Sequence, residues 1–212
     1  AILYDLEKNK IVAQKSSGIK QFYPELGYVE ESASEIYAET LASLIEILES
    51  LDDISEVKGI GITNQRETVI AWDKKTGKPL YNAIVWQCRR TAEFMERINE
   101  KYGELIHRKT GLVCDAYFSA SKMKWLLDNV PEIKSKNEKG ELCFGTVDSF
   151  LCYKLTNGKA FVTDVTNASR TMLFNLETLT WDNELLKIFG ISENSLPKIV
   201  MSDEKVGEFE YK

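Results

Sequence analysis

The chain has 212 residues, 43% of them hydrophobic and 28% charged, and its 27 Lys and Arg against 33 Asp and Glu give a formal net charge of −6. This composition is typical of a soluble globular protein of one or two domains, and the acidic balance excludes a chain-wide electrostatic reason to bind nucleic acid or an anionic membrane. No stretch approaches the roughly 18 consecutive apolar residues that a membrane span needs, and the first residues lack the features of a signal peptide. We therefore expect a cytoplasmic protein whose partner is a small molecule.

The four cysteines are widely spaced, without a Cys-x-x-Cys pair, and His107 is the one histidine of the chain. Neither a zinc site nor a disulfide framework is favoured by this spacing. We expect the cysteines to be small buried residues, and we expect His107 to be a surface or structurally satisfied histidine rather than a general base.

Two hairpins are predicted from apolar runs that flank turn residues. The first pairs Ala1–Asp5 with Lys10–Lys15. The second pairs residues 67–72 with 80–86 across the Gly- and Pro-containing turn 73–79.

A helix is predicted where apolar residues recur at three- and four-residue spacing from Ser32 to Leu51, with Ser32 and Glu35 as a capping box. The β-branched, glycine-containing run Val57–Asn64 predicts a buried strand instead. Further helices are expected at 90–101, 119–129, 149–155 and 181–189.

The remaining segments complete a mixed α/β pattern. Residues 132–140 are predicted to be a solvated loop after Pro131, and residues 143–147 a strand. Asp148 stands where the N-cap of the next helix is expected. Strands and helices that alternate in this way indicate an α/β protein.

Polar side chains of several kinds follow the predicted strand at Thr63–Thr68. Ligands of open α/β sheets bind at the carboxyl ends of strands. Neighbouring side chains of a regular strand point to opposite faces, so Arg66 and Glu67 could share a ligand only if the backbone ends or bends there. A guanidinium beside a carboxylate suits the adjacent hydroxyls of a polyol. The alternative is a solvated strand end or a structural ion pair.

Two aromatic residues are further candidates. Trp86 could offer a flat apolar wall to the carbon chain of a ligand, and Tyr117 could supply a hydroxyl. The alternative for both is burial in the core. No phosphate-binding glycine motif is present in the chain.

Six motifs resemble those of the FGGY carbohydrate kinases, and in particular the members of that family that phosphorylate glycerol. They are Gly61–Thr68, Trp72–Pro79, Tyr81–Thr91, Gly111–Ser119, Phe144–Asp148 and Thr163–Asn175. The resemblance covers essentially the whole chain. It implies a ribonuclease H/actin-like α/β fold, a mixed sheet with flanking helices, of which residues 1–212 would form a partial N-terminal, glycerol-binding domain.

The resemblance also implies an activity, which is the magnesium-dependent transfer of the γ-phosphoryl group of ATP to a terminal hydroxyl of glycerol, giving sn-glycerol 3-phosphate. Arg66 and Glu67 match the pair that holds the hydroxyls of glycerol, Tyr117 matches a further hydroxyl contact and Trp86 matches an aromatic wall. The full-length protein would act in glycerol catabolism and is expected to be a homo-oligomer.

The chain departs from the family pattern at both ends. The phosphate-binding motif Asp-Gln-Gly-Thr-Thr-Ser-Ser-Arg would precede Ala1, and the catalytic aspartate would follow Lys212. We therefore expect no catalytic, ATP-binding or metal-binding residue in this chain, and no activity from it alone. The first strand of the family would lie between 1–5 and 57–64, and its loss would leave two unpaired sheet edges. The alternatives are another FGGY sugar kinase, or a truncated, non-catalytic glycerol-binding or interaction module.

Overall fold

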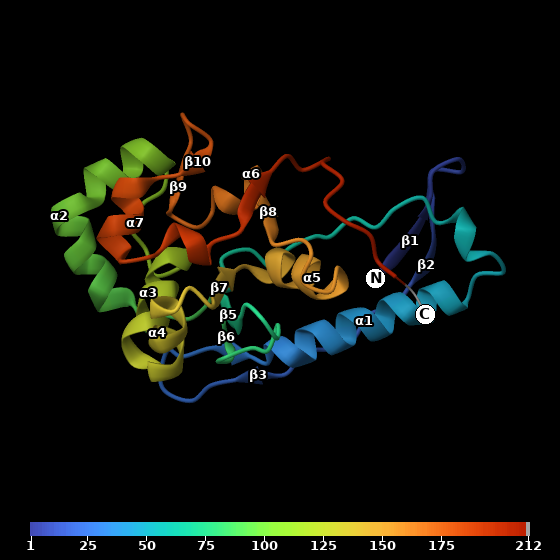
Figure 1. Cartoon of the computed structure of the whole chain (residues 1–212), viewed down its shortest axis with the longest axis horizontal. Coiled ribbons are helices and arrows are strands. Elements are labelled where there is room, and N and C mark those ends of the chain that lie inside the picture. The colour runs from blue at the N-terminus through green and yellow to red at the C-terminus, as the bar shows by residue number, and fades with distance from the viewer. Residues whose placement is uncertain (211–212) are drawn as a thin grey trace.

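The computed structural model describes residues 1–210, in which helices and short strands alternate along the chain (Figure 1). The strands are β1 (Ile2–Asp5), β2 (Lys10–Gln14), β3 (Gln21–Phe22), β4 (Glu30–Glu31), β5 (Ile70–Asp73), β6 (Ala83–Ile84), β7 (Leu142–Gly145), β8 (Val162–Asp164), β9 (Phe174–Asn175), β10 (Thr180–Trp181) and β11 (Lys198–Val200). The α-helices are α1 (Ala33–Glu49), α2 (Ala92–Thr110), α3 (Ser119–Asn129), α4 (Pro131–Glu138), α5 (Val147–Leu155), α6 (Val165–Ala168) and α7 (Asn183–Phe189), and two 3₁₀ turns span Ile54–Glu56 and Glu193–Ser195.

The central strands form a three-stranded and a two-stranded sheet that one isolated bridge joins. Antiparallel pairs join β3 to β4, β4 to β6, and β5 to β7. Ile84 of β6 pairs with Glu30 on one side and with Val69 on the other, which links the two groups of strands. The two predicted hairpins are confirmed: β1 pairs with β2, and residues 69 and 72 pair with 84 and 79 across the second turn.

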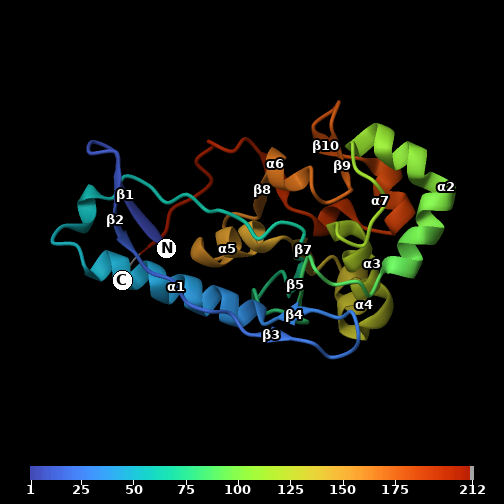
Figure 2. The same ribbon diagram turned by 180° about the vertical axis from the view of Figure 1, so that it is seen from behind.

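The strand β5 and the residue before it separate two hydrophobic cores, because alternate side chains of a strand point to opposite faces. Val69 and Ala71 pack into the larger core, which α2, α3 and α7 cover. Ile70 and Trp72 pack into a smaller core with residues of α1 and α5. Figure 1 shows α2 and α7 at one end of the molecule and α1 along one edge, and Figure 2 shows β3 and β4 beside the start of α1.

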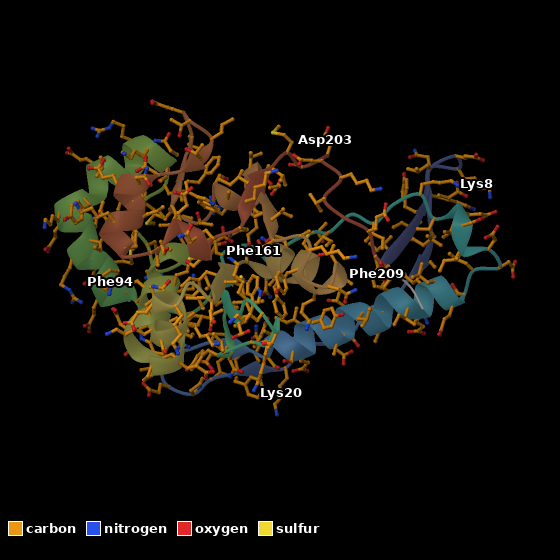
Figure 3. The ribbon with its side chains drawn as sticks, in the orientation of Figure 1. Lys8, Lys20, Phe94, Phe161, Asp203 and Phe209 are labelled. Atoms are coloured by element: carbon orange, nitrogen blue, oxygen red, sulfur yellow. The ribbon has the colours of Figure 1, made fainter. Side chains whose placement is uncertain are left out.

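Aromatic rings fill the smaller core. The Trp72 ring lies 5.3 Å from those of Phe150 and Phe161 and 5.7 Å from that of Tyr153, measured between ring centroids. Figure 3 places Phe161 in the middle of the molecule and Lys8, in the turn of the first hairpin, at one end. The first hairpin therefore lies away from both cores, and apolar residues such as Leu6 in its turn are exposed.

Helix α1 begins as predicted, with one difference in its cap. The Ser32 hydroxyl accepts a hydrogen bond from the backbone N–H of Glu35, as expected of an N-cap. The Glu35 carboxylate accepts from the backbone N–H of Lys20 instead of closing a capping box. Helix α3 has the predicted bounds, whereas α2 continues to Thr110 and ends at Gly111, whose left-handed φ of 70° suits glycine.

Two predictions about helices are wrong. Residues 131–138 form helix α4 instead of a solvated loop, because Pro131 occupies the first helical position, where its missing N–H costs no hydrogen bond, and Ile133 is buried. Asp148 is not the N-cap of α5, since Thr146 occupies that position. The Asp148 side chain is buried and accepts hydrogen bonds from the side chains of Thr146, Thr163 and Asn167.

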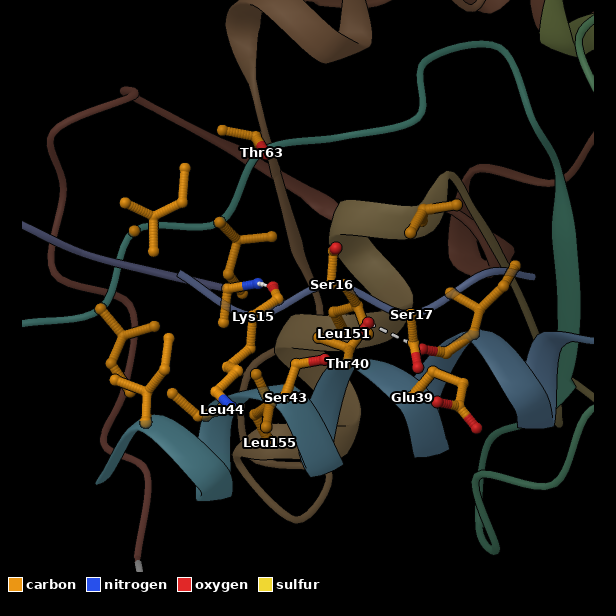
Figure 4. A pocket seen from close by; sticks show the side chains of 18 of the residues that line it. Lys15, Ser16, Ser17, Glu39, Thr40, Ser43, Leu44, Thr63, Leu151 and Leu155 are labelled. Atoms are coloured by element: carbon orange, nitrogen blue, oxygen red, sulfur yellow. Dashed lines mark hydrogen bonds between the residues drawn. The ribbon is translucent and has the colours of Figure 1, made fainter. Parts of the chain in front are cut away.

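The predicted buried strand at 57–64 is also absent from the structure. The segment is extended but has no strand partner among residues 1–210, and most of it is exposed. It borders a groove of about 550 Å³ between α1, α5 and the start of β1. Figure 4 shows the groove from close by, with Thr40, Ser43 and Leu44 on α1, Leu151 and Leu155 on α5, and Thr63 on the segment. A strand forms only where its backbone groups find partners, and apolar sequence pattern alone does not supply them.

The predictions for the cysteines and the histidine can also be compared with the structure. Cys88 and Cys143 are buried as expected, Cys114 and Cys152 are half-buried, and all four are free thiols. His107 is exposed on α2. Within residues 1–210, none of the helices combines the length and the apolar character that crossing a bilayer requires.

Acid is expected to weaken the turn of the second hairpin. Asp73 is bonded to Lys136 at 2.6 Å and to the N–H of Thr76, which hold its pKa well below the usual range. Hydrogen bonds from Lys75 and Lys136 lower the pKa of Glu141 to about 2. Both carboxyl groups have a lower pKa in the folded state than in the unfolded chain. Their ion pairs therefore stabilise the fold fully above the usual carboxyl pKa, near 4.5, and this stabilisation is lost as the pH falls to about 2. Thermal melts of wild type and Glu141→Gln should differ at pH 6 and converge near pH 2.

The exposed carboxylate of Glu132 on α4 provides a matched control for that measurement. Glu132→Gln should not reproduce the pH-dependent difference. A difference between wild type and Glu141→Gln that is unchanged from pH 6 to pH 2 would contradict the assignment.

Candidate functional site

The backbone bends sharply at Arg66 and Glu67, as the sequence predicted for two neighbours that share a ligand. Residues 57–65 are extended, and the chain turns at 66–67. Glu67 has a φ of 64°, in the left-handed region that a non-glycine residue seldom adopts. The turn buries the Glu67 side chain, which is 3% exposed, and leaves Arg66 at the surface.

Asn64 anchors the chain two residues before this turn. Its side-chain amide donates to the Thr146 hydroxyl at 3.2 Å, and its side-chain oxygen accepts from the backbone N–H of Asp148 at 3.1 Å. Both partners lie at the start of α5, where backbone N–H groups have no partner within the helix. The turn is therefore held against a rigid element.

Arg170, which follows α6, is the partner of the buried Glu67 carboxylate. Its Nε donates to Glu67 Oε1 at 2.6 Å. The Arg170 guanidinium carbon also lies 5.9 Å from the ring centroid of Tyr117 and 5.0 Å from that of Phe118, within the range of cation–π contacts. Arg170 thus contacts two of the predicted site residues.

Trp86 and Tyr117 lie against each other at the same place. Their ring centroids are 5.7 Å apart in an edge-to-face arrangement. The backbone N–H of Trp86 donates to the hydroxyl of Thr68, the residue after Glu67, at 3.2 Å. Trp86 is 38% exposed, and Tyr117 is half-buried and packs against the larger core, so neither ring is fully enclosed.

Arg170 therefore joins Glu67 to Tyr117, and Trp86 joins them through its ring contact with Tyr117 and its bond to Thr68. Arg66 lies in the adjacent turn, and within residues 1–210 it forms no hydrogen bond or ion pair with the other three. None of the four lines the groove beside α1, whose lining reaches the neighbouring Asn64 and Gln65.

Lys122 of α3 lies next to the Tyr117 loop and is completely buried. Its Nζ donates to the backbone oxygens of Tyr117 and Phe118, at 3.1 Å to the latter. Burial lowers the pKa of Lys122 to about 7, and the nearby Cys88 and Glu67 offset part of the shift.

Asp115 also shapes the Tyr117 loop. Its Oδ1 accepts from the backbone N–H of Tyr117 at 2.7 Å and from Arg89 at 2.6 Å. Asp115, Lys122 and Arg170 were not predicted as site residues. Arg170 acts on Glu67, which only folding places beside it, whereas Asp115 and Lys122 bond to backbone groups two to five positions away. Asp115 and Arg170 stand in motifs that carried the resemblance, which is the one signal the sequence offered.

Chemically, the cluster combines an acceptor carboxylate, a phenol that can donate and accept, and a flat apolar ring. A polyol presents hydroxyls that donate and accept, on a short carbon chain that can lie against an aromatic face. The arrangement thus suits a small polyhydroxylated ligand. Within residues 1–210, no three His, Cys, Asp or Glu side chains lie together as ligands for a metal ion.

Comparison with known proteins gives the family. Residues 1–212 match the model of the FGGY family of carbohydrate kinases, N-terminal domain. The chain belongs to the FGGY family of carbohydrate kinases. A glycerol kinase of Thermococcus gammatolerans is 54% identical over 208 residues, which cover 98% of this chain and 41% of that protein.

Solved structures of the family share the fold. The structure superimposes on the crystal structure of Plasmodium falciparum glycerol kinase with ADP with a TM-score of 0.94 and 40% identity, covering 100% of this chain and 42% of that one. For the ligand-bound xylulose kinase of Lactobacillus acidophilus the TM-score is 0.82 and the identity 27%, over 94% of this chain and 39% of that one. The predicted actin-like α/β fold is confirmed. The FGGY chain described here spans about two fifths of the length of these relatives.

Proposed function

We propose that this chain supplies the polyol-binding part of a kinase that transfers the γ-phosphoryl group of ATP to a terminal hydroxyl of glycerol. The observation that supports it most is the meeting of Glu67, Tyr117 and Trp86 at one turn. Arg66, beside Glu67, completes the proposed set of glycerol contacts. The 54% identity to a glycerol kinase, against 27% to a xylulose kinase, favours glycerol over a pentose.

In this proposal the chain contributes to catalysis by placing the substrate. Phosphoryl transfer depends mostly on positioning and charge stabilisation, so a pocket that fixes the reacting hydroxyl supplies a large share of the rate enhancement. Glu67 and Arg66 would bind neighbouring hydroxyls, Tyr117 a further hydroxyl, and Trp86 would cover the carbon chain and exclude water. ATP would supply the phosphoryl group.

The residues for ATP, magnesium and the catalytic aspartate are assigned in the proposal to parts of the full-length protein outside residues 1–212. Homo-oligomerisation and a cytoplasmic location remain predictions.

The full-length protein tests the substrate. A coupled assay of ADP release should show a much higher kcat/KM for glycerol than for pentoses or hexoses. A strong preference for a pentose or hexose would replace the proposal by another FGGY sugar kinase.

A second experiment tests the chain of 212 residues by itself. We expect no glycerol-dependent ADP release, because the phosphate-binding and catalytic residues are assigned elsewhere. A thermal shift with glycerol, but not with a monohydric alcohol at the same concentration, would show that the binding part is retained. Glycerol-dependent ADP release by this chain would refute the assignment of the phosphate-binding and catalytic residues to other parts of the protein.

A further inference from the structure

Arg170 connects groups that lie far apart in the sequence. Glu67 is 103 residues away along the chain, yet its carboxylate oxygen is 2.6 Å from Arg170 Nε. The same guanidinium lies over the rings of Tyr117 and Phe118, from a third segment. The turn at Glu67 and the loop at Tyr117 therefore meet on one side chain.

We propose that Arg170 is a positioning residue for polyol binding, which holds the Glu67 carboxylate and the Tyr117 ring in one fixed arrangement. This inference rests on the proposed function, because it takes Glu67 and Tyr117 as groups that contact the polyol. Arg170 acts through them.

The chemistry of arginine fits this role better than that of lysine. A planar guanidinium donates hydrogen bonds in its plane while its face lies against an aromatic ring, whereas an ammonium is a point charge that cannot do both in the same way. Glu67 is 3% exposed, and a carboxylate that is buried to this extent needs a charged partner. The positive φ of Glu67 is a second reason, because such a conformation persists only where the surroundings hold it.

Arg170 uses only one of the two carboxylate oxygens of Glu67. Its bond is to Oε1, and within residues 1–210 no hydrogen bond reaches Oε2. A carboxylate that is held by one oxygen keeps the other as an acceptor for a hydroxyl donor. Arg170 would thus set the direction of the acceptor without competing for it.

The backbone around Arg170 is itself anchored. The Asp164 side chain caps α6 by accepting from the N–H of Asn167, and the N–H of Arg170 donates to the Asn167 carbonyl at 3.0 Å. On the other side, the carbonyl of Thr171 accepts from the N–H of Ala120 in α3 at 2.9 Å. A side chain that extends from an anchored backbone can fix the position of its partners.

Steady-state kinetics of the full-length protein test the inference. Arg170→Gln should raise the KM for glycerol about tenfold or more, with a smaller change in kcat and an unchanged KM for ATP, because loss of positioning removes binding of the polyol alone. Arg170→Lys should recover part of the loss. Arg108→Gln, an exposed arginine of α2, is the matched control and should behave as wild type.

A double-mutant cycle separates positioning from direct contact. If Arg170 acts through Glu67, the Arg170→Gln/Glu67→Gln double variant should lose little more than Glu67→Gln alone. Additive losses, or an unchanged glycerol KM in Arg170→Gln, would overturn the inference. If Arg170→Gln does not fold, the cycle is run with Arg170→Lys. A Glu67→Gln variant with wild-type kinetics would instead refute the proposed function at this site, which keeps the two failures distinguishable.

Discussion

Glu67→Gln in the full-length protein is expected to lower kcat/KM for glycerol by about two orders of magnitude. The substitution keeps the shape of the side chain but replaces one acceptor oxygen by a donor and leaves the Arg170 guanidinium without its charged partner. Leaving a hydrogen-bonding group of this kind unpaired costs about 2–3 kcal/mol, and each 1.4 kcal/mol is about tenfold in rate. The measurement is the coupled assay with glycerol as the varied substrate.

Arg66→Ala is expected to produce a loss of similar size, because its guanidinium would bind hydroxyls of the same ligand. For Glu67→Gln the control is Glu132→Gln, which removes one exposed carboxylate on α4. Wild-type kinetics in both Glu67→Gln and Arg66→Ala would remove the pair from the binding site.

Lys122→Met is expected to change how stability depends on pH. Burial lowers the pKa of Lys122 to about 7 from its usual value of 10.5. Between these two values the unfolded chain holds a proton that the folded protein has released, so the free energy of unfolding rises with pH. The slope for one proton is at most about 1.4 kcal/mol per pH unit. Methionine has no such proton, so the stability of wild type relative to Lys122→Met should rise by about 2 kcal/mol from pH 7 to pH 9.

The groups that face Lys122 determine how this is measured. Cys88, Glu67 and Asp115 favour its charged form, and Arg89 opposes it. Urea unfolding of the full-length proteins at pH 7 and pH 9, followed by Trp fluorescence, gives the two free energies. Because Cys88 is one of the groups that act on Lys122, the comparison is repeated in a Cys88→Ala background. A stability difference that is equal at both pH values would show that Lys122 keeps the same protonation in both states.

The sequence anticipated most of the local structure, for reasons that lie within a few residues. Ser32 caps α1 because its hydroxyl reaches an N–H three residues along the chain. The second hairpin closes because Asp73 accepts from N–H groups in its own turn. Where a partner from elsewhere in the fold was needed, as at Val57–Asn64, the pattern predicted a strand that did not form.

The features of the site likewise divide into those that the sequence predicted and those that the fold determined. Sequence identified Arg66, Glu67, Trp86 and Tyr117 as candidates, and the requirement that the backbone bend at 66–67 was confirmed. The sequence could not predict that Arg66 lies at the surface while Glu67 is buried. The direction of each side chain depends on the φ and ψ angles that the surrounding fold imposes.

Short-range chemistry and motif order thus determined, from sequence alone, the α/β character, the FGGY family and the residues proposed to bind the polyol. Only the tertiary structure decided that Arg170 holds Glu67 and that Lys122 is buried beside the Tyr117 loop. A helix cap or a turn depends on neighbours along the chain, whereas the Arg170 to Glu67 bond joins residues 103 positions apart. Contacts across such distances exist only once the two cores on either side of β5 have brought the segments together.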